Sequence, residues 1–450
     1  MKIHTPRIIL SGTSSGCGKT TVTCAVLSAL VARGMKVSSF KCGPDYIDPM
    51  FHEKAIGTKG SNLDSFFYDD NTIRFLLARN SRDADICVIE GAMGFYDGRG
   101  IKTCEKSCYE LSRTTNSPVV LIVNCKGMAY SVTALIRGFL EQKQDSGIVA
   151  VILNNVTKAT APLLAEAIEE QFRGRVKMLG YFPPMNDCVF ESRHLGLITA
   201  DEIGDIREKL NKLSVQAQES IDIDALISLA NDAQALEYED VAVTRFDAPV
   251  RIVVAMDRAF CFYYRDNLDL LESMGAKIVF FSPIYDRSLP ECDGLYLGGG
   301  YPELYKAELS KNHSMRRSIK AALKEGLPCI AECGGFMYLT ESIDGADMAD
   351  VLPGRCENKG KLVRFGYLTL TAKRDNMLCR AGAKINVHAF HHYDAQYIGD
   401  GFEAQKSNGI KWGCVFATDS LYAGYPHLPF YSNTDFAKNF YLACLAKKEA

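Results

Sequence analysis

The sequence predicts an α/β protein made of two doubly wound domains. Apolar, strand-length runs alternate with helix-length segments in both halves of the 450-residue chain. Near-continuous apolar strands in such an alternation are typical of a parallel sheet covered by helices on both faces. Between the halves, a helix-like and increasingly acidic stretch has no strand pattern. A glycine-rich turn directly after the first strand indicates that the first sheet binds phosphate.

The composition limits the classes of function. With 47% hydrophobic residues, 23% charged residues and a net charge of −3, it is that of an ordinary globular protein. This balance gives no reason to expect nucleic acid, which usually requires a basic surface. No apolar run is long enough to span a membrane, and no signal peptide is recognisable. The sixteen cysteines are scattered and form no C-x-x-C pair, so we expect reduced thiols in a cytoplasmic protein.

The strongest local motif is RIILSGTSSGCGKTT, residues 7–21. An apolar strand leads into a Gly/Ser-rich turn that ends where a helix begins. In such a loop the backbone N–H groups and the helix N-terminus surround the phosphates of a nucleotide, and the lysine neutralises the β- and γ-phosphates. We expect ATP to contact the following residues of this motif: Gly12, Thr13, Gly16, Gly18, Lys19, Thr20 and Thr21.

The predicted strands of the first half continue the parallel sheet. They lie at 37–41, 85–90, 119–123, 149–153 and 176–180. The second of these ends on Glu90, and an acidic residue in that position completes the Mg²⁺ site of many phosphate-loop enzymes. The Thr20 hydroxyl and the Glu90 carboxylate are therefore the predicted Mg²⁺ ligands.

Further polar residues stand in loops where ligands bind, and each has a structural alternative. Asp45 and Asp48 follow the strand 37–41, at the edge where ligands bind a parallel sheet, but aspartates of this kind also cap turns. Arg193 and His194 together could meet an anionic substrate. A helix-like segment follows them, and we expect a first domain at 1–198, a helical tail and linker at 199–245, and a second domain at 246–450.

The second half repeats the strand–helix alternation. Strands are predicted at 251–255, 277–281, 294–297 and 328–331, and the last leads into Glu-Cys-Gly-Gly, with Cys333 as the cysteine. A cysteine on a tight strand-to-helix turn gains thiolate character from the helix N-terminus, which predicts a nucleophile. A thiolate needs a base. His427, between two prolines in a downstream loop, is the better candidate among the histidines.

Six segments, in the same order along essentially the whole chain, resemble the cobyrinate a,c-diamide synthase family. They are 12–20 (GTSSGCGKT), 41–48 (KCGPDYID), 90–97 (EGAMGFYD), 193–197 (RHLGL), 298–303 (GGGYPE) and 331–335 (AECGG). The resemblance implies a dethiobiotin-synthetase-like P-loop domain followed by a class I glutamine amidotransferase domain of the cobyric acid synthase type, with a flavodoxin-like fold.

The resemblance also implies the chemistry. The a- and c-acetate carboxylates of cobyrinate, or of metal-free hydrogenobyrinate, would be amidated in cobalamin biosynthesis through an acyl phosphate, with ATP and Mg²⁺ and with glutamine as nitrogen donor. Cys333 would form a thioester with glutamine, His427 would act as base and acid, and Gly299 or Gly300 with Gly334 would bind the oxyanion. The corrinoid would contact Asp45, Tyr46, Asp48, Asp64, Asp97, Arg193 and His194. A homodimer is compatible with the sequence.

Two positions depart from the usual patterns. The P-loop glycine stands at Gly12 rather than at Thr13, an offset shared with dethiobiotin synthetase. Pro429 replaces the second histidine of the His-Leu-His-Phe motif usual in this family. Many class I amidotransferases orient the catalytic histidine with a glutamate at this position, which this family generally lacks, so the residue that orients His427 is not identified from the sequence. Nickel-sirohydrochlorin a,c-diamide synthase, with the same motifs, is an alternative. A P-loop switch ATPase with an inactive amidotransferase domain is another, against which Ser14 argues, because partition ATPases carry a lysine there.

Overall fold

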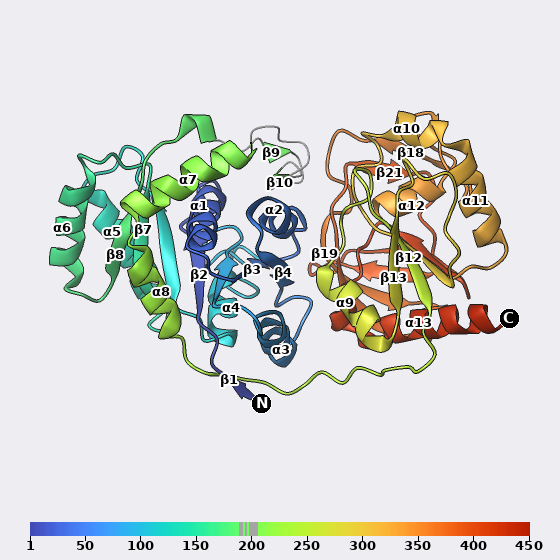
Figure 1. The fold of residues 1–450 in the computed structure, drawn as a ribbon, viewed down its shortest axis with the longest axis horizontal. Coiled ribbons are helices and arrows are strands. Elements are labelled where there is room, and N and C mark those ends of the chain that lie inside the picture. Colours follow the sequence, from blue (N-terminus) through green and yellow to red (C-terminus); the bar gives the residue numbers. More distant parts are fainter. Residues whose placement is uncertain (189–191, 194–195, 198–205) are drawn as a thin grey trace. The chain divides into compact units, whose positions relative to one another are not determined.

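The computed structural model describes residues 1–188, 192–193, 196–197 and 206–450 (Figure 1). The chain forms two compact units, Met1–Val241 and Ala242–Ala450. Each unit is built on a largely parallel sheet with helices, which confirms the predicted fold class. Within the described residues, every helix is too short or too polar to cross a lipid bilayer.

The first unit contains a seven-stranded sheet whose strands are all parallel. From edge to edge they are β4 (Lys59–Leu63), β3 (Val37–Cys42), β5 (Ile86–Glu90), β2 (Arg7–Gly12), β6 (Val119–Asn124), β7 (Ile148–Asn154) and β8 (Lys177–Phe182). The chain starts at β2, moves outward on one side, returns to β5 and continues on the other side. The switch point of the sheet therefore lies at the carboxyl end of β2, where ligands bind this class of fold.

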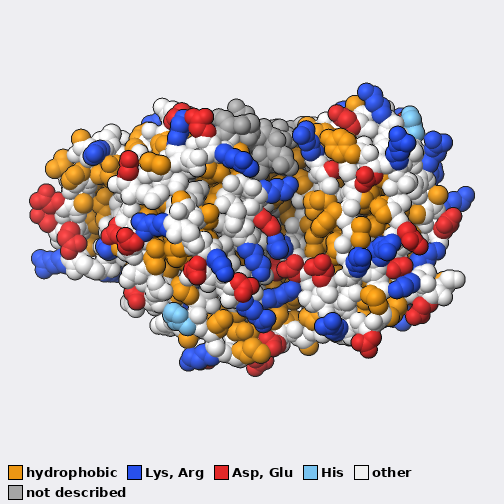
Figure 2. Space-filling view, viewed as in Figure 1, with side chains coloured by type: hydrophobic (Ala, Val, Ile, Leu, Met, Phe, Trp, Pro, Cys, Tyr) orange, Lys and Arg blue, Asp and Glu red, His pale blue; other side chains and the backbone are white. Residues whose placement is uncertain are grey.

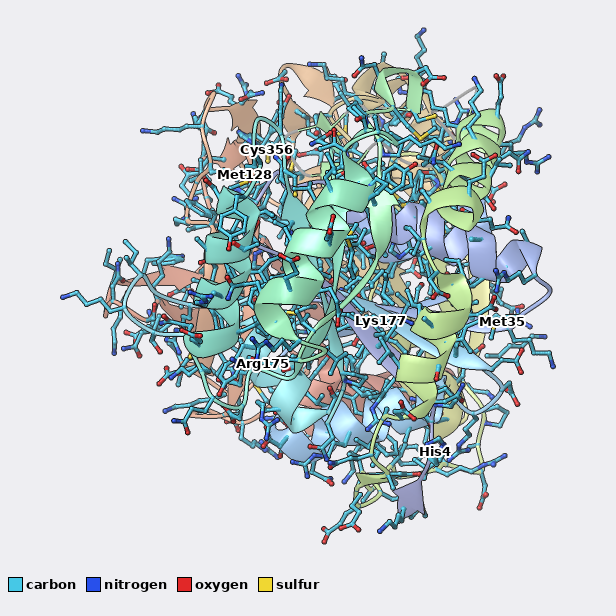
Figure 3. The ribbon with its side chains drawn as sticks, turned by 90° about the vertical axis from the view of Figure 1, so that its left-hand side faces the viewer. His4, Met35, Met128, Arg175, Lys177 and Cys356 are labelled. Carbon is cyan, nitrogen blue, oxygen red and sulfur yellow. The ribbon has the colours of Figure 1, made fainter. Side chains whose placement is uncertain are left out.

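Helices connect these strands. They are α1 (Lys19–Ala32), α2 (Ile47–Phe51), which continues as a π-helix (His52–Ile56), α3 (Asp70–Asn80), α4 (Cys108–Thr114), α5 (Ser131–Glu141), α6 (Ala161–Phe172), α7 (Ile206–Ser220) and α8 (Ile223–Asn231). Helix α1 is buried on most of its surface, because α7 and α8 pack against it. Figure 3 shows Lys177 beside α8, where its amine lies 3.4 Å from the carboxylate of Asp222.

Several short strands of the first unit were not predicted from the sequence. The segment 199–245 has no strand pattern, yet β11 (Leu236–Glu237) pairs with β1 (Lys2–Ile3). Strand β4 was also not predicted, because its sequence KGSNL is polar. Its polar side chains are buried through hydrogen bonds: the Asn62 amide donates to the carbonyls of Gly43 (2.9 Å) and Asp45 (2.7 Å).

A buried arginine joins distant parts of the first unit. The guanidinium of Arg7 is fully buried and donates to the carbonyls of Thr5, Thr115, Asn116 and Gln234. Burial lowers the pKa of Arg7 to about 10. Its hydrogen bonds therefore connect the start of β2 to the loop before β6 and to the segment after α8.

We expect Arg7→Met to lower the stability of the first unit by about 2–4 kcal/mol, because methionine leaves these buried carbonyls without donors. The midpoint of urea unfolding of the full chain, followed by fluorescence and by circular dichroism, measures the change. Arg33→Met is the matched control: its partner Asp224 is 85% exposed, so removing this ion pair costs under about 1 kcal/mol. Equal midpoints for the two variants would contradict the role assigned to Arg7.

The second unit contains a six-stranded sheet. Its order is β13 (Lys277–Phe281), β12 (Arg251–Ala255), β14 (Gly294–Leu297), β15 (Cys329–Glu332), β25 (Leu421–Gly424) and β24 (Phe416–Ala417), with only β24 antiparallel. The five parallel strands have the 2-1-3-4-5 order of flavodoxin-like sheets. The helices are α9 (Arg265–Met274), α10 (Lys306–Lys311), α11 (His313–Lys324), α12 (Gly334–Leu339) and α13 (Thr434–Glu449).

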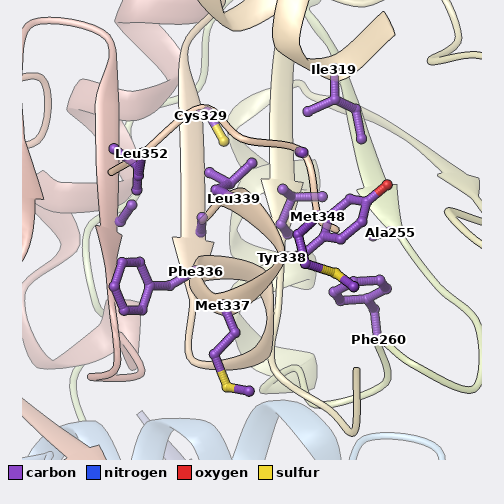
Figure 4. Close-up of a cluster of buried hydrophobic side chains, with 14 of the residues drawn as sticks. Ala255, Phe260, Ile319, Cys329, Phe336, Met337, Tyr338, Leu339, Met348 and Leu352 are labelled. Atoms are coloured by element: carbon purple, nitrogen blue, oxygen red, sulfur yellow. The ribbon is translucent and has the colours of Figure 1, made fainter. Parts of the chain in front are cut away.

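Helix α12 lies inside the core of this unit (Figure 4). All six of its residues are buried, and the ring of Tyr338 makes an edge contact with Phe260 at 5.4 Å between centroids. Phe336 makes a similar contact with Tyr425 at 5.1 Å. A helix packed on every side has little freedom to shift, so the residue that precedes it is held in a fixed position.

Two further sheets in this unit were not predicted from the sequence. One contains β17 (Ala346–Asp347), β16 (Ser342–Ile343), β18 (Arg355–Asn358) and β21 (Tyr393–Ala395); the other contains β20 (Lys384–Ala389), β19 (Gly366–Ala372), β22 (Phe402–Gln405) and β23 (Lys411–Cys414). Most of these strands are too short for a clear periodicity.

On the face seen in Figure 2, acidic and basic side chains are interspersed, in keeping with the small net charge.

Candidate active sites

The glycine-rich turn joins β2 to α1 as predicted. The Lys19 amine curls back to the carbonyl of Ser14 at 2.8 Å. A Cβ on Gly12 would lie 2.2 Å from the Cys17 sulfur and 2.8 Å from Lys19 Cγ. The offset glycine is therefore explained by packing, since the lysine side chain passes directly over that residue.

The rest of the turn is fixed from β7. The Asn154 amide, at the carboxyl end of β7, donates to the carbonyl of Cys17 at 2.9 Å. Gly18 has φ 93°, and a Cβ there would lie 2.0 Å from the same amide. Of the other predicted ATP contacts, Gly16 has φ 73°, Thr13 donates its N–H to Ile122 (3.2 Å), and Thr20 and Thr21 lie in the first turn of α1.

A buried charged cluster lies beside this turn. The Thr20 hydroxyl donates to Glu90 Oε1 at 2.8 Å, so the two predicted Mg²⁺ ligands are adjacent. The Lys41 amine bridges Glu90 Oε1 (2.9 Å) and Asp48 Oδ2 (2.5 Å). His52 Nε2 lies 3.3 Å from Glu90 Oε2. Burial raises the pKa of Glu90, but the charges of Lys41 and His52 and their hydrogen bonds outweigh it and hold the pKa well below its usual range.

Lys41 and His52 are residues that the sequence reasoning missed. A lysine inside the apolar strand that becomes β3 was the available signal for Lys41, because buried lysines are rare unless paired. Burial lowers the pKa of Lys41, yet Asp48 and Glu90 raise it well above the ordinary value. Asp45 lies in the same cluster, and burial together with the charge of Asp48 raises its pKa to about 7.

The remaining predicted substrate contacts fall in different places. Asp64 Oδ1 accepts the N–H groups of Phe66 and Phe67, and Asp97 Oδ2 accepts that of Gly94 at 2.9 Å, so both carboxylates cap turns. Three predicted contacts remain. Tyr46 directly precedes α2, and Arg193 lies in β9 (Ser192–Arg193), which pairs with β10 (Gly196–Leu197). His194 is outside the described residues.

The second unit places Cys333 on a sharp turn between β15 and α12. Its backbone has φ 48° and ψ −102°, a conformation that non-glycine residues rarely adopt and that costs about 1–3 kcal/mol. The Cys333 N–H donates to the carbonyl of Gly424 at 2.8 Å, which fixes the turn to β25. The side chain is buried and points to His427, with which it forms a hydrogen bond.

His427 is held in a polar pocket between elements far apart in the sequence. The backbone N–H of His427 donates to the carbonyl of His388 at 2.9 Å, and the ring Nδ1 lies 3.5 Å from Glu332 Oε2. Burial lowers the pKa of His427, but the hydrogen bonds and charges of Cys333 and Glu332 outweigh this effect and raise it to about 9. The raised pKa favours the protonated imidazole near neutral pH, with the sulfur beside it.

The three glycines predicted to bind an oxyanion are not equivalent. The Gly299 N–H donates to the carbonyl of Phe262 at 3.3 Å. Within the described chain, no acceptor is recorded for the N–H groups of Gly300 and Gly334. A Cβ on Gly334 would lie 3.1 Å from the Gly300 nitrogen, so these two backbones meet beside Cys333.

Together the two units define a class of protein: an ATP-dependent, amide-forming ligase joined in one chain to a glutamine amidotransferase. Comparison with protein families agrees with this class. Residues 8–197 match the CobQ/CobB/MinD/ParA nucleotide binding domain, and residues 251–435 match the CobB/CobQ-like glutamine amidotransferase domain.

Individual relatives identify the family. The cobyrinate a,c-diamide synthase of Clostridium acetobutylicum is 40% identical to this chain over 441 residues, which cover 96% of this chain and 99% of the relative. That of Priestia megaterium is 37% identical over 454 residues (98% of each chain), and that of Salmonella typhimurium is 37% identical over 440 residues (94% of each chain). The chain belongs to the cobyrinate a,c-diamide synthase family.

Proposed function

We propose that the protein amidates the a- and c-acetate carboxylates of cobyrinate, or of hydrogenobyrinate, in cobalamin biosynthesis, with ATP as energy source and glutamine as nitrogen donor. The observation that carries this proposal is the Cys333–His427 pair, assembled on a strained turn in a chain that also has a phosphate loop. Residues 1–198 are the ligase domain, 199–245 a helical tail and linker, and 246–450 the amidotransferase domain. The sixteen free thiols support a cytoplasmic location. A homodimer remains a prediction, to be tested by light scattering.

Nitrogen is released in the second unit. The Cys333 thiolate attacks the side-chain amide carbon of glutamine, and the N–H groups of Gly300 and Gly334 receive the oxyanion that forms. As the C–N bond breaks, protonated His427 gives its proton to the leaving nitrogen, which yields ammonia and a γ-glutamyl thioester. Neutral His427 then takes a proton from water while the water oxygen bonds to the thioester carbon; the C–S bond breaks, the Cys333 thiolate is restored, and glutamate leaves.

The first unit uses this ammonia. A carboxylate oxygen of the corrinoid attacks the γ-phosphorus of ATP, ADP leaves, and ammonia then displaces phosphate from the acyl phosphate. Lys19 neutralises charge on the γ-phosphate as it transfers. The corrinoid would be held by the residues predicted above, of which Asp45 and Asp48 belong to the charged cluster.

The residues beside the phosphate loop fit a Mg²⁺ ion. The Thr20 hydroxyl and the Glu90 carboxylate are hard oxygen ligands 2.8 Å apart, and the surrounding charges keep the carboxylate ionised. In the described part of the chain no group of three or more His, Cys, Asp and Glu side chains is arranged around a metal, so phosphate oxygens and water would complete the shell. The ion would neutralise charge on the phosphates.

The substrate is tested by competition. Cobyrinate and nickel-sirohydrochlorin are offered in parallel with ATP, Mg²⁺ and glutamine, and the products are weighed by mass spectrometry. The proposal expects cobyrinate a,c-diamide and no amidated nickel-sirohydrochlorin. If nickel-sirohydrochlorin alone were converted, it would replace the corrinoid as the proposed substrate. If no glutamate were released, the result would favour a P-loop switch ATPase.

The glutaminase reaction should lose activity at high pH. Because the pKa of His427 is raised from 6.5 to about 9, the imidazolium persists through neutral pH and is lost above about 9. We expect kcat/KM for glutamate release to stay level near pH 8 and to fall through pH 9. Protonation of His427 also stabilises the fold, fully below pH 6.5 and no longer above about 9. A falling limb centred near 6.5 would contradict the ion pair.

A further inference from the structure

We propose that Glu332, the residue directly before the nucleophile, is the positioning residue for His427 in glutamine hydrolysis. Position 429, where many class I amidotransferases carry the orienting glutamate, is a proline here and has no side-chain acceptor. The inference deepens the proposed function, since it concerns the site at which that function releases nitrogen from glutamine.

The Glu332 carboxylate is placed for this role. It is 1% exposed, and its two oxygens have different partners. Oε1 accepts the N–H of Leu428 at 3.0 Å and the hydroxyl of Tyr296 at 3.1 Å. Oε2 faces Nδ1 of His427 at 3.5 Å. With one oxygen fixed by two donors, the other is held toward the imidazole, and Nε2 of the ring is left for the Cys333 sulfur.

The backbone explains how adjacent residues reach one imidazole. Successive side chains of a strand point to opposite faces, so Glu332 and Cys333 would normally diverge. The positive φ of 48° at Cys333 turns the chain sharply at that point. The sulfur then approaches His427 from one side while the carboxylate lies on the other.

The loop that carries His427 is fixed by the same polar network. The buried amide of Asn267 donates to the Leu428 carbonyl at 2.6 Å and accepts the Phe430 N–H at 2.8 Å. The backbone N–H groups of residues 428 and 430 therefore both donate hydrogen bonds that hold the loop, and no donor from residue 429 is needed for this. Pro429, which has no N–H, fits this loop without loss of a hydrogen bond.

Among the titratable groups named around His427, Glu332 is the carboxylate that can stabilise a positive charge on the imidazole. From β15 and the turn after it come Glu332 and Cys333; from β20 and the residues that follow come His388 and His391. Burial lowers the pKa of both neighbouring histidines to about 3, so they are neutral and do not stabilise an imidazolium. A carboxylate at Nδ1 favours the protonated ring. In the neutral ring it favours the tautomer with the proton on Nδ1, which leaves Nε2 as the acceptor that faces the sulfur.

Glu332→Gln tests the proposal, because glutamine keeps an oxygen for the Leu428 N–H and the Tyr296 hydroxyl but removes the charge. We expect kcat for glutamate release to fall about 10²-fold with little change in KM. The high-pH limb should move from about 9 toward 6.5, the ordinary value for histidine. Amidation with free ammonia should persist. Glu332→Asp keeps the charge but draws the carboxylate back from Nδ1, so its limb should lie between that of Glu332→Gln and that of the unchanged protein.

A second readout does not depend on the proposed substrates. The rate at which iodoacetamide alkylates Cys333, followed by peptide mass spectrometry against pH, reports the thiolate–imidazolium pair directly. Glu332→Gln should shift this profile, whereas Glu291→Gln, which removes a 95% exposed carboxylate of the same unit, should not. If Glu332→Gln loses activity with both profiles unmoved, Glu332 only supports the loop and the proposal is wrong.

The outcomes separate the two proposals. A wild-type protein that releases no glutamate would contradict the proposed function, while its alkylation profile would still decide whether Glu332 sets the state of His427. If Glu332→Gln does not fold, Glu332→Asp decides the matter, with Glu291→Gln as the comparison. The proposal then expects the aspartate variant, whose carboxylate is drawn back from Nδ1, to lose kcat and to shift the limb, and an unshifted limb overturns it.

Discussion

Cys333→Ala is expected to abolish glutamine-dependent amidation, with a loss of about 10³-fold or more in rate, while amidation supported by ammonium salts continues. The reason is that alanine cannot form the thioester, and His427 alone cannot release the nitrogen of glutamine. The phosphate loop and the charged cluster belong to the first unit and are not altered. The measurement is product formation with each nitrogen source under saturating ATP.

Cys292→Ser is the matched control. It changes a partly buried thiol in the same unit, in the loop before β14, and should leave both nitrogen sources in use. If Cys333→Ala retained glutamine-dependent activity equal to that of the unchanged protein, the thioester mechanism would be wrong. Equal loss with glutamine and with ammonia would instead indicate that the variant has disturbed the fold, which circular dichroism would reveal.

The second large effect is expected for Lys19→Ala. Removal of the amine from the phosphate loop should lower amidation about 10²–10³-fold with either nitrogen source, because the γ-phosphate loses its positive partner during transfer. Glutamine hydrolysis without ATP should continue, since Cys333 and His427 are unchanged. This is the opposite pattern to that of Cys333→Ala, so the two variants together assign one reaction to each unit.

Lys36→Ala provides the comparison for Lys19. It removes an exposed lysine from the same unit, in the turn after α1, and should have no measurable effect on either reaction. Amidation by Lys19→Ala at the rate of the unchanged protein would refute the assignment of the phosphate loop. Loss of amidation in both lysine variants would point to a general dependence on charge instead.

Much of the architecture could be predicted because short stretches of sequence show the pattern of each strand and helix. The apolar runs that become β2, β5, β6 and β7 are buried inside a parallel sheet, and burial on both faces favours continuous hydrophobicity. Strand β4 escaped prediction because Asn62 satisfies its burial through hydrogen bonds rather than through hydrophobicity. In the two small sheets of the second unit, β16, β17 and β21 are too short to show a period, whereas β19 and β20 do alternate between buried and half-buried side chains and were overlooked.

Site residues, too, could be predicted where they depend on a local pattern and were missed where they depend on contacts between distant segments. The phosphate loop and the turn that holds Cys333 are local, so spacing and residue type identify them. Lys41 was missed because its role depends on Glu90, which meets it only when β3 and β5 pair, and on Asp48, which lies in α2. Asp64 and Asp97, predicted to meet substrate, accept backbone N–H groups in turns, and their part in substrate binding remains a prediction.

By itself the sequence determined the two sheets, the phosphate loop and the nucleophile, because each depends on neighbours within a few residues along the chain. Only the tertiary structure decided which carboxylate faces His427. Glu332 and His427 lie far apart in sequence and come together because β15 and β25 pair in parallel, which brings the loop after β25 to the end of β15. Such a contact is set by strand pairing and by packing, which no local pattern records.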